Sequence, residues 1–79
     1  MSKEEIANIF TYHAPFGDQA ARYTNLRDEA RALALLINGL CPDSREKSLA
    51  ITSLQQSIMW ANAAIAINEN PVPSSGVLL

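Results

Sequence analysis

The stretch Met59-Trp60-Ala61-Asn62-Ala63-Ala64-Ile65-Ala66-Ile67 decides the fold of this chain. Its small residues let another backbone approach closely, and it places one indole and one carboxamide within an otherwise apolar run. A carboxamide in such surroundings needs hydrogen-bond partners, so the stretch should be buried on more than one side. Because 79 residues can hardly enclose it alone, we expect a partner, first of all further copies of the same chain.

The composition also favours association. A chain this short buries only roughly 60% of the surface that its unfolded form exposes, which leaves a lone domain marginally stable. The single cysteine excludes an intramolecular disulfide, and one histidine with one cysteine cannot close a zinc site without ligands from elsewhere. Hydrophobic residues make up 48% of the chain and charged residues 18%, which is rich in apolar side chains for so small a surface. We therefore expect a homo-oligomer.

The net charge of −2 argues against a general DNA or RNA coat, because such binding requires a basic face. A small anion held in a local pocket stays compatible with this charge. Glu4 and Glu5 stand where a signal peptide carries basic residues, and the longest apolar run, Ala32 to Ile37, is shorter than the roughly 20 residues of a membrane span. We expect a soluble cytosolic protein with neither DNA nor a membrane as its partner.

The first helix is predicted from about Lys3 to about Phe10. Ser2 and Glu5 have the spacing of a capping box, in which each side chain binds the backbone N–H of the other residue. The helix should dock onto the rest of the chain through an apolar stripe formed by Ile6, Ile9 and Phe10.

Two long helices follow. Asp18 can cap the second helix, which is predicted from about Gln19 to about Leu40 and ends before Pro42. Its apolar residues step by three and four positions, which keeps one stripe facing a partner: Tyr23, Leu26, Ala30, Leu33, Ile37 and Leu40.

Asp43 and Glu46 resemble a second capping box and predict the start of the third helix. The same step recurs there at Ile51, Leu54, Ile58, Ala61 and Ile65, so the third helix can lie antiparallel to the second. A second apolar face remains, formed by Leu49, Met59, Trp60, Ala64 and Ile67. The prediction is an all-α protein with a short N-terminal helix and two long antiparallel helices, in which residues 1–70 form a single domain and residues 71–79 a flexible tail.

The segment Thr11 to Gly17 should connect the first two helices without being helical throughout. Pro15 restricts the residue before it, and Gly17 permits a sharp turn. Tyr12, His13 and Phe16 place three aromatic rings within five residues. The rings can form a hydrophobic lid over the helices, or a stacking wall for a planar ligand such as a nucleobase.

Catalytic chemistry is not indicated. The glycines are scattered and do not form a phosphate-binding loop. Cys41 and His13 are formally a thiol and a base, but Cys41 is better explained as a small buried hydrophobic residue at the end of the second helix. We expect neither an enzyme nor a cofactor or metal site.

The arginines of the second helix are more informative. Arg27 and Arg31 are four residues apart and share one face, whereas Arg22 lies about 140° around the helix from Arg27. Surface pairing with Asp28 or Glu29 would contribute little to stability. The alternative is that these guanidinium groups bind phosphate oxygens, to which their fork-shaped donors are well suited.

Several motifs together resemble one known family. They are Phe10-Thr11-Tyr12-His13-Ala14-Pro15; Asp18-Gln19 with Tyr23; Cys41-Pro42-Asp43-Ser44-Arg45-Glu46 with Ser48-Leu49-Ala50; and Met59-Trp60-Ala61-Asn62-Ala63-Ala64-Ile65-Ala66. In this order and spacing they resemble the small phage proteins that act as anti-CBASS cyclic-oligonucleotide sponges. The resemblance spans about residues 8 to 70.

The resemblance implies a helical protomer that assembles into a compact homohexamer. It implies binding of cyclic dinucleotides such as 3',3'-cyclic GMP-AMP and, in several members, of cyclic trinucleotides at separate sites. These messengers would be sequestered without cleavage in the cytoplasm of the infected bacterial host, so that the CBASS effector stays inactive.

The resemblance also carries over to particular residues. The base-stacking tyrosine of the family falls on Tyr12, and its basic residue near the phosphates, often lysine, falls on Arg27. Ile67 stands where many relatives carry a basic residue, which weakens the case for a trinucleotide site. We assign ligand binding to Tyr12, Arg27, His13, Pro15 and Arg31, and the oligomer core to Met59, Trp60, Asn62 and Ala63.

Two other functions remain as rivals. An oligomeric helical scaffold or regulatory protein would have no nucleotide ligand. A small phosphodiesterase would consume its ligand instead of storing it.

Overall fold

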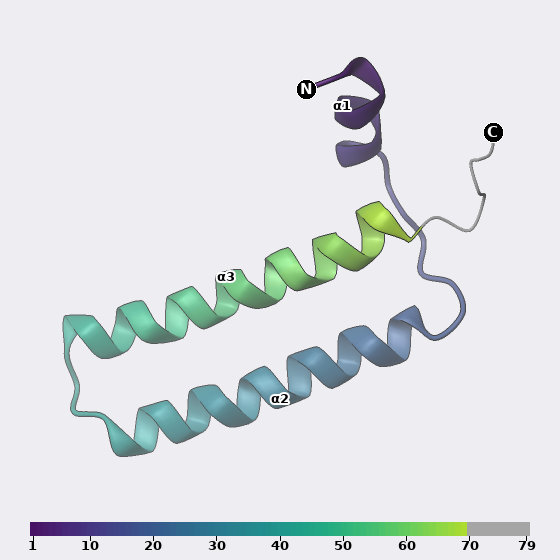
Figure 1. Ribbon diagram of the computed structural model, residues 1–79. Coiled ribbons are helices and arrows are strands. Elements are labelled where there is room, and N and C mark those ends of the chain that lie inside the picture. The colour runs from purple at the N-terminus through teal and green to yellow at the C-terminus, as the bar shows by residue number, and fades with distance from the viewer. Residues whose placement is uncertain (70–79) are drawn as a thin grey trace.

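Three helices follow one another in the computed structural model of the chain, which describes residues 1–69. They are α1 (Lys3–Ile9), α2 (Gln19–Leu40) and α3 (Arg45–Asn68). Figure 1 shows α2 and α3 lying side by side and antiparallel as a helical hairpin, with α1 near the open end of the hairpin. The predicted all-α class, with one short and two long helices, is confirmed. The extent of the single domain stays a prediction, and the predicted tail lies outside the described residues.

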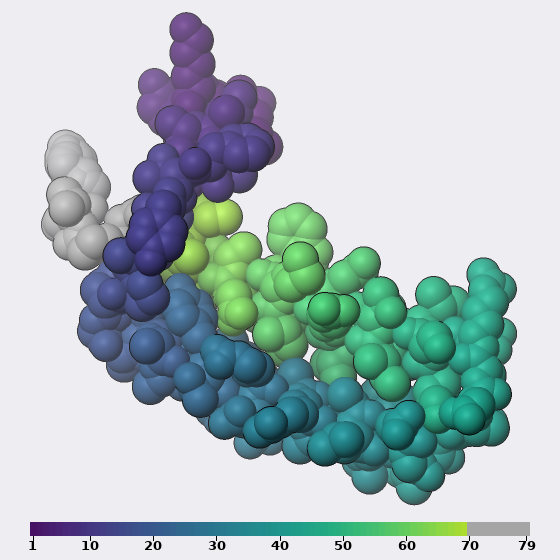
Figure 2. Space-filling model, turned by 180° about the vertical axis from the view of Figure 1, so that it is seen from behind, coloured from purple at the N-terminus to yellow at the C-terminus, as the bar shows by residue number. Residues whose placement is uncertain are grey.

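Helix α1 begins at the predicted capping box. The Ser2 hydroxyl accepts a hydrogen bond from the Glu5 N–H at 3.0 Å, and the Glu5 carboxylate accepts one from the Ser2 N–H at 2.7 Å. Hydrogen bonding to the Glu5 carboxylate, first from the Ser2 backbone and then from the Ser2 side chain, lowers the pKa of Glu5. The expectation that α1 docks through its apolar stripe is not met within one chain, because Ile6, Ile9 and Phe10 are exposed. Figure 2 shows α1 projecting from one end of the hairpin.

The two long helices begin differently from the prediction. Asp18 occupies the capping position of α2, but its side chain makes no capping bond and instead accepts a hydrogen bond from Arg22 Nε at 3.2 Å. The cap of α3 is Ser44 and not Asp43, because the Ser44 hydroxyl accepts the Lys47 N–H at 3.1 Å. Asp43 lies one residue too early and binds the Lys47 ammonium at 2.5 Å, which lowers the pKa of its carboxyl.

The hairpin interface follows the predicted stripe of α3, whose members are all half-buried. On α2 the prediction is wrong at two positions, since Leu33 and Leu40 are exposed and Ala34 is half-buried instead. A small alanine lets the two helices approach closely, and the larger leucines then lie on the outer flank. The half-buried hydrophobic residues of α2 are Tyr23, Leu26, Ala30, Ala34 and Ile37.

No hydrophobic side chain of residues 1–69 is buried, and the single buried residue in that range is Gln19, at 3% exposure. The hairpin is one layer of helices, and the molecule measures only 14 Å in its thinnest direction. Stable domains pack at least two layers around their core, so this layer leaves its hydrophobic side chains without cover. Most of the predicted second apolar face is exposed, including Met59 and Trp60, whereas Ile67 is half-buried.

Cys41 follows α2 in the short connection to α3 and is exposed, so its predicted burial is wrong within one chain. A position beyond the last turn of α2 has no helix packed over it. Within the described residues, no helix has the length and apolar character needed to cross a bilayer.

Candidate functional site

Two hollows lie along the hairpin and share Arg27 and Asn62. The open-end cavity, of about 350 Å³, is lined by His13 from the loop before α2 and by residues of both long helices: Tyr23, Arg27, Asn62, Ala63 and Ala66. The mid-hairpin groove, of about 330 Å³, is mainly apolar. Its polar lining consists of Arg27, Arg31, Gln55 and Asn62, and Met59 also contributes. Both hollows reach the lower end of the volume range typical of small-molecule sites.

The three arginines of α2 have different surroundings. Arg22 binds Glu69, and Arg31 lies 3.6 Å from Asp28 in an exposed pair, as surface pairing predicts. Arg27 has no ion pair with any residue of the described range 1–69. Its guanidinium is therefore the one of the three that a ligand can engage without breaking a pair.

His13 enters the open-end cavity with one ring nitrogen already engaged. Its Nε2 lies 2.8 Å from the Asn8 carbonyl oxygen, which can only accept a hydrogen bond. Nε2 must therefore carry the proton, and in the neutral ring Nδ1 is left as the acceptor. The bond fixes both the tautomer and the orientation of the ring beside Arg27.

Asn62 lies where the two hollows meet. Its Oδ1 is buried and has no hydrogen-bond partner among the described residues. Leaving a buried acceptor unsatisfied costs about 1–3 kcal/mol, so a donor from a ligand or from another chain would be stabilising at this point.

Some residues that the sequence assigned to ligand binding or to the oligomer core lie outside the two hollows. Tyr12 is 83% exposed, and Tyr12 and Pro15 line neither the cavity nor the groove. The interpretation of the loop as a hydrophobic lid is thus wrong for Tyr12 within one chain. Trp60, assigned to the oligomer core, is 76% exposed, whereas Ala63 forms part of the cavity wall.

A comparison with protein-family models identifies the family to which this hairpin belongs. The model of the Acb2/Tad1 hairpin domain matches residues 2–66, which is most of the chain. The chain belongs to the Acb2/Tad1 hairpin family. Acb2 is the anti-CBASS cyclic-oligonucleotide sponge family, so the resemblance inferred from the motifs is confirmed. Searches of curated proteins and of solved structures find no match.

Membership of the Acb2/Tad1 family supports a phage anti-CBASS sponge role in broad terms, and a nucleotide-binding sponge rather than an enzyme. The matched range contains α1, α2, the connecting loop and every residue that lines the open-end cavity. The thiol and imidazole considered as a catalytic pair lie at opposite ends of this hairpin, Cys41 in the α2–α3 connection and His13 before α2 (Figure 1). Residues 1–69 contain no group of three or more metal-binding side chains.

Sequence reasoning did not assign two residues of the Acb2/Tad1 hairpin, one in the cavity wall and one in a polar network beside the connecting loop. Tyr23 was assigned only to the hairpin stripe, but it lies one turn before Arg27, and this spacing could have placed it in the cavity wall. Gln19 lies one turn before Tyr23 and joins a polar network with Arg22 and Glu69. No local pattern predicts this network, because its partners are about fifty residues apart in the chain.

Proposed function

We propose that the chain assembles with copies of itself and sequesters cyclic dinucleotides, such as cyclic GMP-AMP, without cleaving them. The site of action is the cytoplasm of the infected bacterial host, where sequestration would keep the CBASS effector inactive. The proposal extends the sponge role of the Acb2/Tad1 family to a ligand class and a mode of action.

The unpaired guanidinium of Arg27 in the open-end cavity carries this proposal. A phosphodiester needs a cationic donor, and a guanidinium supplies two parallel N–H groups to its oxygens. The cavity also offers the rings of His13 and Tyr23, while Ala63 and Ala66 leave space beside them. Arg27 stands where the family often has lysine, so the charge is kept and the donor geometry differs.

Tyr12 supplies a free aromatic face for a nucleobase. Its exposure means that stacking a base on it displaces only water, and such stacking contributes about 1–3 kcal/mol per base. Tyr12 borders His13 in sequence but lies outside the cavity lining, so its exposed ring is free to stack on a base bound at this cavity or at the cavity of a neighbouring copy. Pro15 restricts the backbone of the loop and thereby reduces the entropy lost on binding.

Self-association is supported by the uncovered hydrophobic side chains of the hairpin. Exposed residues that a monomer would not leave in water include Leu35, Leu40, Met59 and Trp60. A homohexamer is the assembly that the family resemblance implies. Clefts sealed between its subunits would exclude water and strengthen the contacts between Arg27 and a phosphate.

A release experiment tests the proposal. Purified protein is mixed with cyclic GMP-AMP, separated from free ligand and heated, and the supernatant is analysed by chromatography. Intact cyclic dinucleotide in the supernatant supports sequestration. A linear product would indicate a phosphodiesterase, and absence of uptake would indicate a scaffold without a nucleotide ligand; either result contradicts the proposal.

A parallel titration with cyclic trinucleotides tests the second ligand class. The carbonyl oxygen of Ile67 accepts a hydrogen bond from Asn8, and its apolar side chain replaces the basic residue of many relatives. We therefore expect dinucleotides to bind more tightly than trinucleotides.

A further inference from the structure

The loop that connects α1 to α2 is attached at both of its ends to the last turn of α3. On one side, Asn8 Nδ2 donates a hydrogen bond to the Ile67 carbonyl oxygen at 3.0 Å. On the other, Gln19 Nε2 donates one to the Glu69 carbonyl oxygen at 3.2 Å. Carbonyl groups at the end of a helix lack partners within the helix, and here residues about fifty to sixty positions away satisfy two of them.

Gln19 is the centre of the second attachment. Its Oε1 accepts the Phe16 N–H at 3.1 Å, while its Nε2 also approaches the Glu69 carboxylate at 3.4 Å. One side chain thus joins the end of the loop to the end of α3. Its burial, at 3% exposure, protects these bonds from competition with water.

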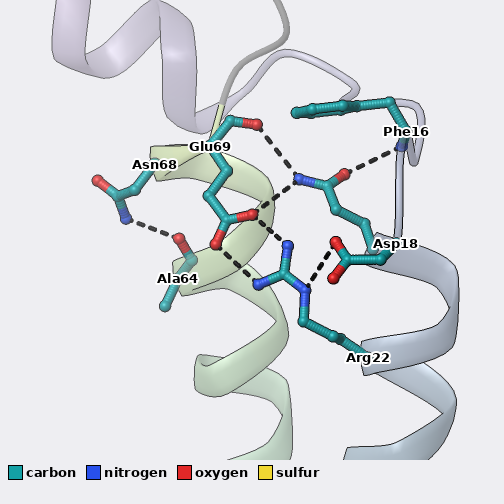
Figure 3. Close-up of polar contacts among 7 residues, drawn as sticks. Phe16, Asp18, Arg22, Ala64, Asn68 and Glu69 are labelled. Carbon is teal, nitrogen blue, oxygen red and sulfur yellow. Dashed lines mark hydrogen bonds and ion pairs between the residues drawn. The ribbon is translucent and has the colours of Figure 1, made fainter.

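Arg22 and Glu69 close the network (Figure 3). Arg22 Nη1 donates to Glu69 Oε2 at 2.9 Å, and Nη2 pairs with Oε1, which gives a two-pronged contact. Arg22 Nε also binds Asp18 at 3.2 Å. The hydrogen bonds from Arg22 and then from Gln19 lower the pKa of Glu69 to about 2, so the carboxylate stays ionised at neutral pH.

We propose that Gln19 and Glu69 are positioning residues that fix residues 10–18, the ligand loop, onto the last turn of α3. The proposal rests on the proposed function, because the ligand loop carries Tyr12 and His13. Neither Gln19 nor Glu69 lines the open-end cavity or the mid-hairpin groove, so each acts through the loop and not on the ligand.

The physical basis is the population of the binding-competent loop. If the loop leaves α3 for part of the time, the observed affinity falls by the fraction of time in which Tyr12 and His13 are correctly placed. A buried network that ties both ends keeps that fraction close to one. Loss of the network should therefore slow association and leave the dissociation rate of the complex nearly unchanged.

The test uses the full chain with the substitutions Glu69→Gln and Gln19→Leu, which preserve side-chain size. Hydrogen–deuterium exchange without ligand should become at least fivefold faster in residues 10–18, because the anchored state is less populated. The Kd for cyclic GMP-AMP should rise about fivefold through the association rate. Assembly mass serves as the readout of a merely structural effect and should not change. The melting temperature at neutral pH should fall modestly, because the Arg22–Glu69 contact or the Gln19 bonds are lost.

Two further variants sharpen the result. Glu69→Asp keeps the charge and should restore most of the affinity. Asp43→Asn removes a carboxylate paired with Lys47 at the other end of the hairpin, and it should leave both loop exchange and affinity unchanged.

The outcomes are separable. If hydrogen–deuterium exchange of the ligand loop is unchanged in Glu69→Gln and Gln19→Leu, these residues do not fix the loop to α3. If exchange is faster but the affinity is unchanged, fixing the loop does not position it for the ligand. If the wild-type chain binds no cyclic dinucleotide, the proposed function fails and the positioning role fails with it. Hydrogen–deuterium exchange of the ligand loop then shows by itself whether Gln19 and Glu69 fix the loop to α3.

Discussion

At the scale of single residues, pairing determines which arginine of α2 is available to a ligand. Arg22 is held by Glu69 and Asp18, and Arg31 is close to Asp28. Arg27 has no such partner within residues 1–69 and borders both hollows. Three side chains of one type on one helix therefore have different surroundings, and their ion pairs distinguish them better than their spacing does.

Arg27→Ala should weaken binding of cyclic GMP-AMP by about tenfold or more, because a bond from a charged donor to a phosphate is lost. Titration calorimetry measures the effect, and light scattering should find the assembly unchanged. Arg31→Ala is the matched control on the same face and should have a smaller effect, since Arg31 is already paired with Asp28. Dissociation of Arg27→Ala into small species would count against a ligand role.

Gly17→Ala should lower the free energy of unfolding by about 1 kcal/mol, because Gly17 has a φ of +57° and an L residue is strained there. Gly39 is the control within a helix, with open space around the position that a Cβ would occupy. Gly39→Ala should raise the free energy of unfolding by roughly 0.5–1 kcal/mol. Denaturant titration at equal chain concentration measures both free energies of unfolding. A change of the same sign in the two variants would contradict the left-handed conformation of Gly17 or the helical one of Gly39.

At the scale of the helices, the sequence was informative where a pattern is local. The capping box at Ser2, the bounds of α2 and the stripe of α3 all depend on residues within a few turns of one another, and all three are confirmed. The errors arise where two local solutions compete. Ser44 and Asp43 can each cap α3, and the choice depends on Lys47, which bonds to both.

Ser44→Ala should destabilise the protein by about 0.5–2 kcal/mol, because the Lys47 N–H loses its acceptor at the start of α3. Asp43→Ala is the neighbouring control and should have a smaller effect, because that carboxylate is fully exposed and caps no N–H group. Thermal unfolding monitored by circular dichroism measures the two changes. A larger loss in Asp43→Ala would show that the cap is misassigned.

The contact between Arg22 of α2 and Glu69 at the end of α3 predicts a pH dependence. The pKa of the Glu69 carboxyl is about 2 in the folded state, lower than the usual 4.5. The contact therefore stabilises the fold above pH 4.5, and this contribution is lost as the pH falls toward 2. The melting temperature of the wild type should fall over this range more steeply than that of Glu69→Gln. Parallel curves for the two proteins would contradict a role of the pair in stability.

At the scale of the whole molecule, the uncovered hydrophobic side chains of residues 1–69 could be predicted, as could His13 and Arg27, but the complete wall of the open-end cavity could not. Composition and the stretch around Trp60 already indicated that one chain cannot cover its hydrophobic side chains, and no hydrophobic residue of the described range is buried. The open-end cavity depends instead on contacts distant in sequence, such as Asn8 with Ile67 and Gln19 with Glu69. Such contacts have no local signature, which is why the Gln19 network could not be predicted, whereas the spacing between Tyr23 and Arg27 is visible in the sequence.

Native mass spectrometry of the purified chain with cyclic GMP-AMP tests the central claim most directly, because one spectrum gives both the assembly mass and the mass of any bound ligand. The account predicts an assembly of several 8.6 kDa chains, six in the homohexamer that the family resemblance implies, carrying intact cyclic dinucleotide. A single 8.6 kDa chain without ligand would contradict it.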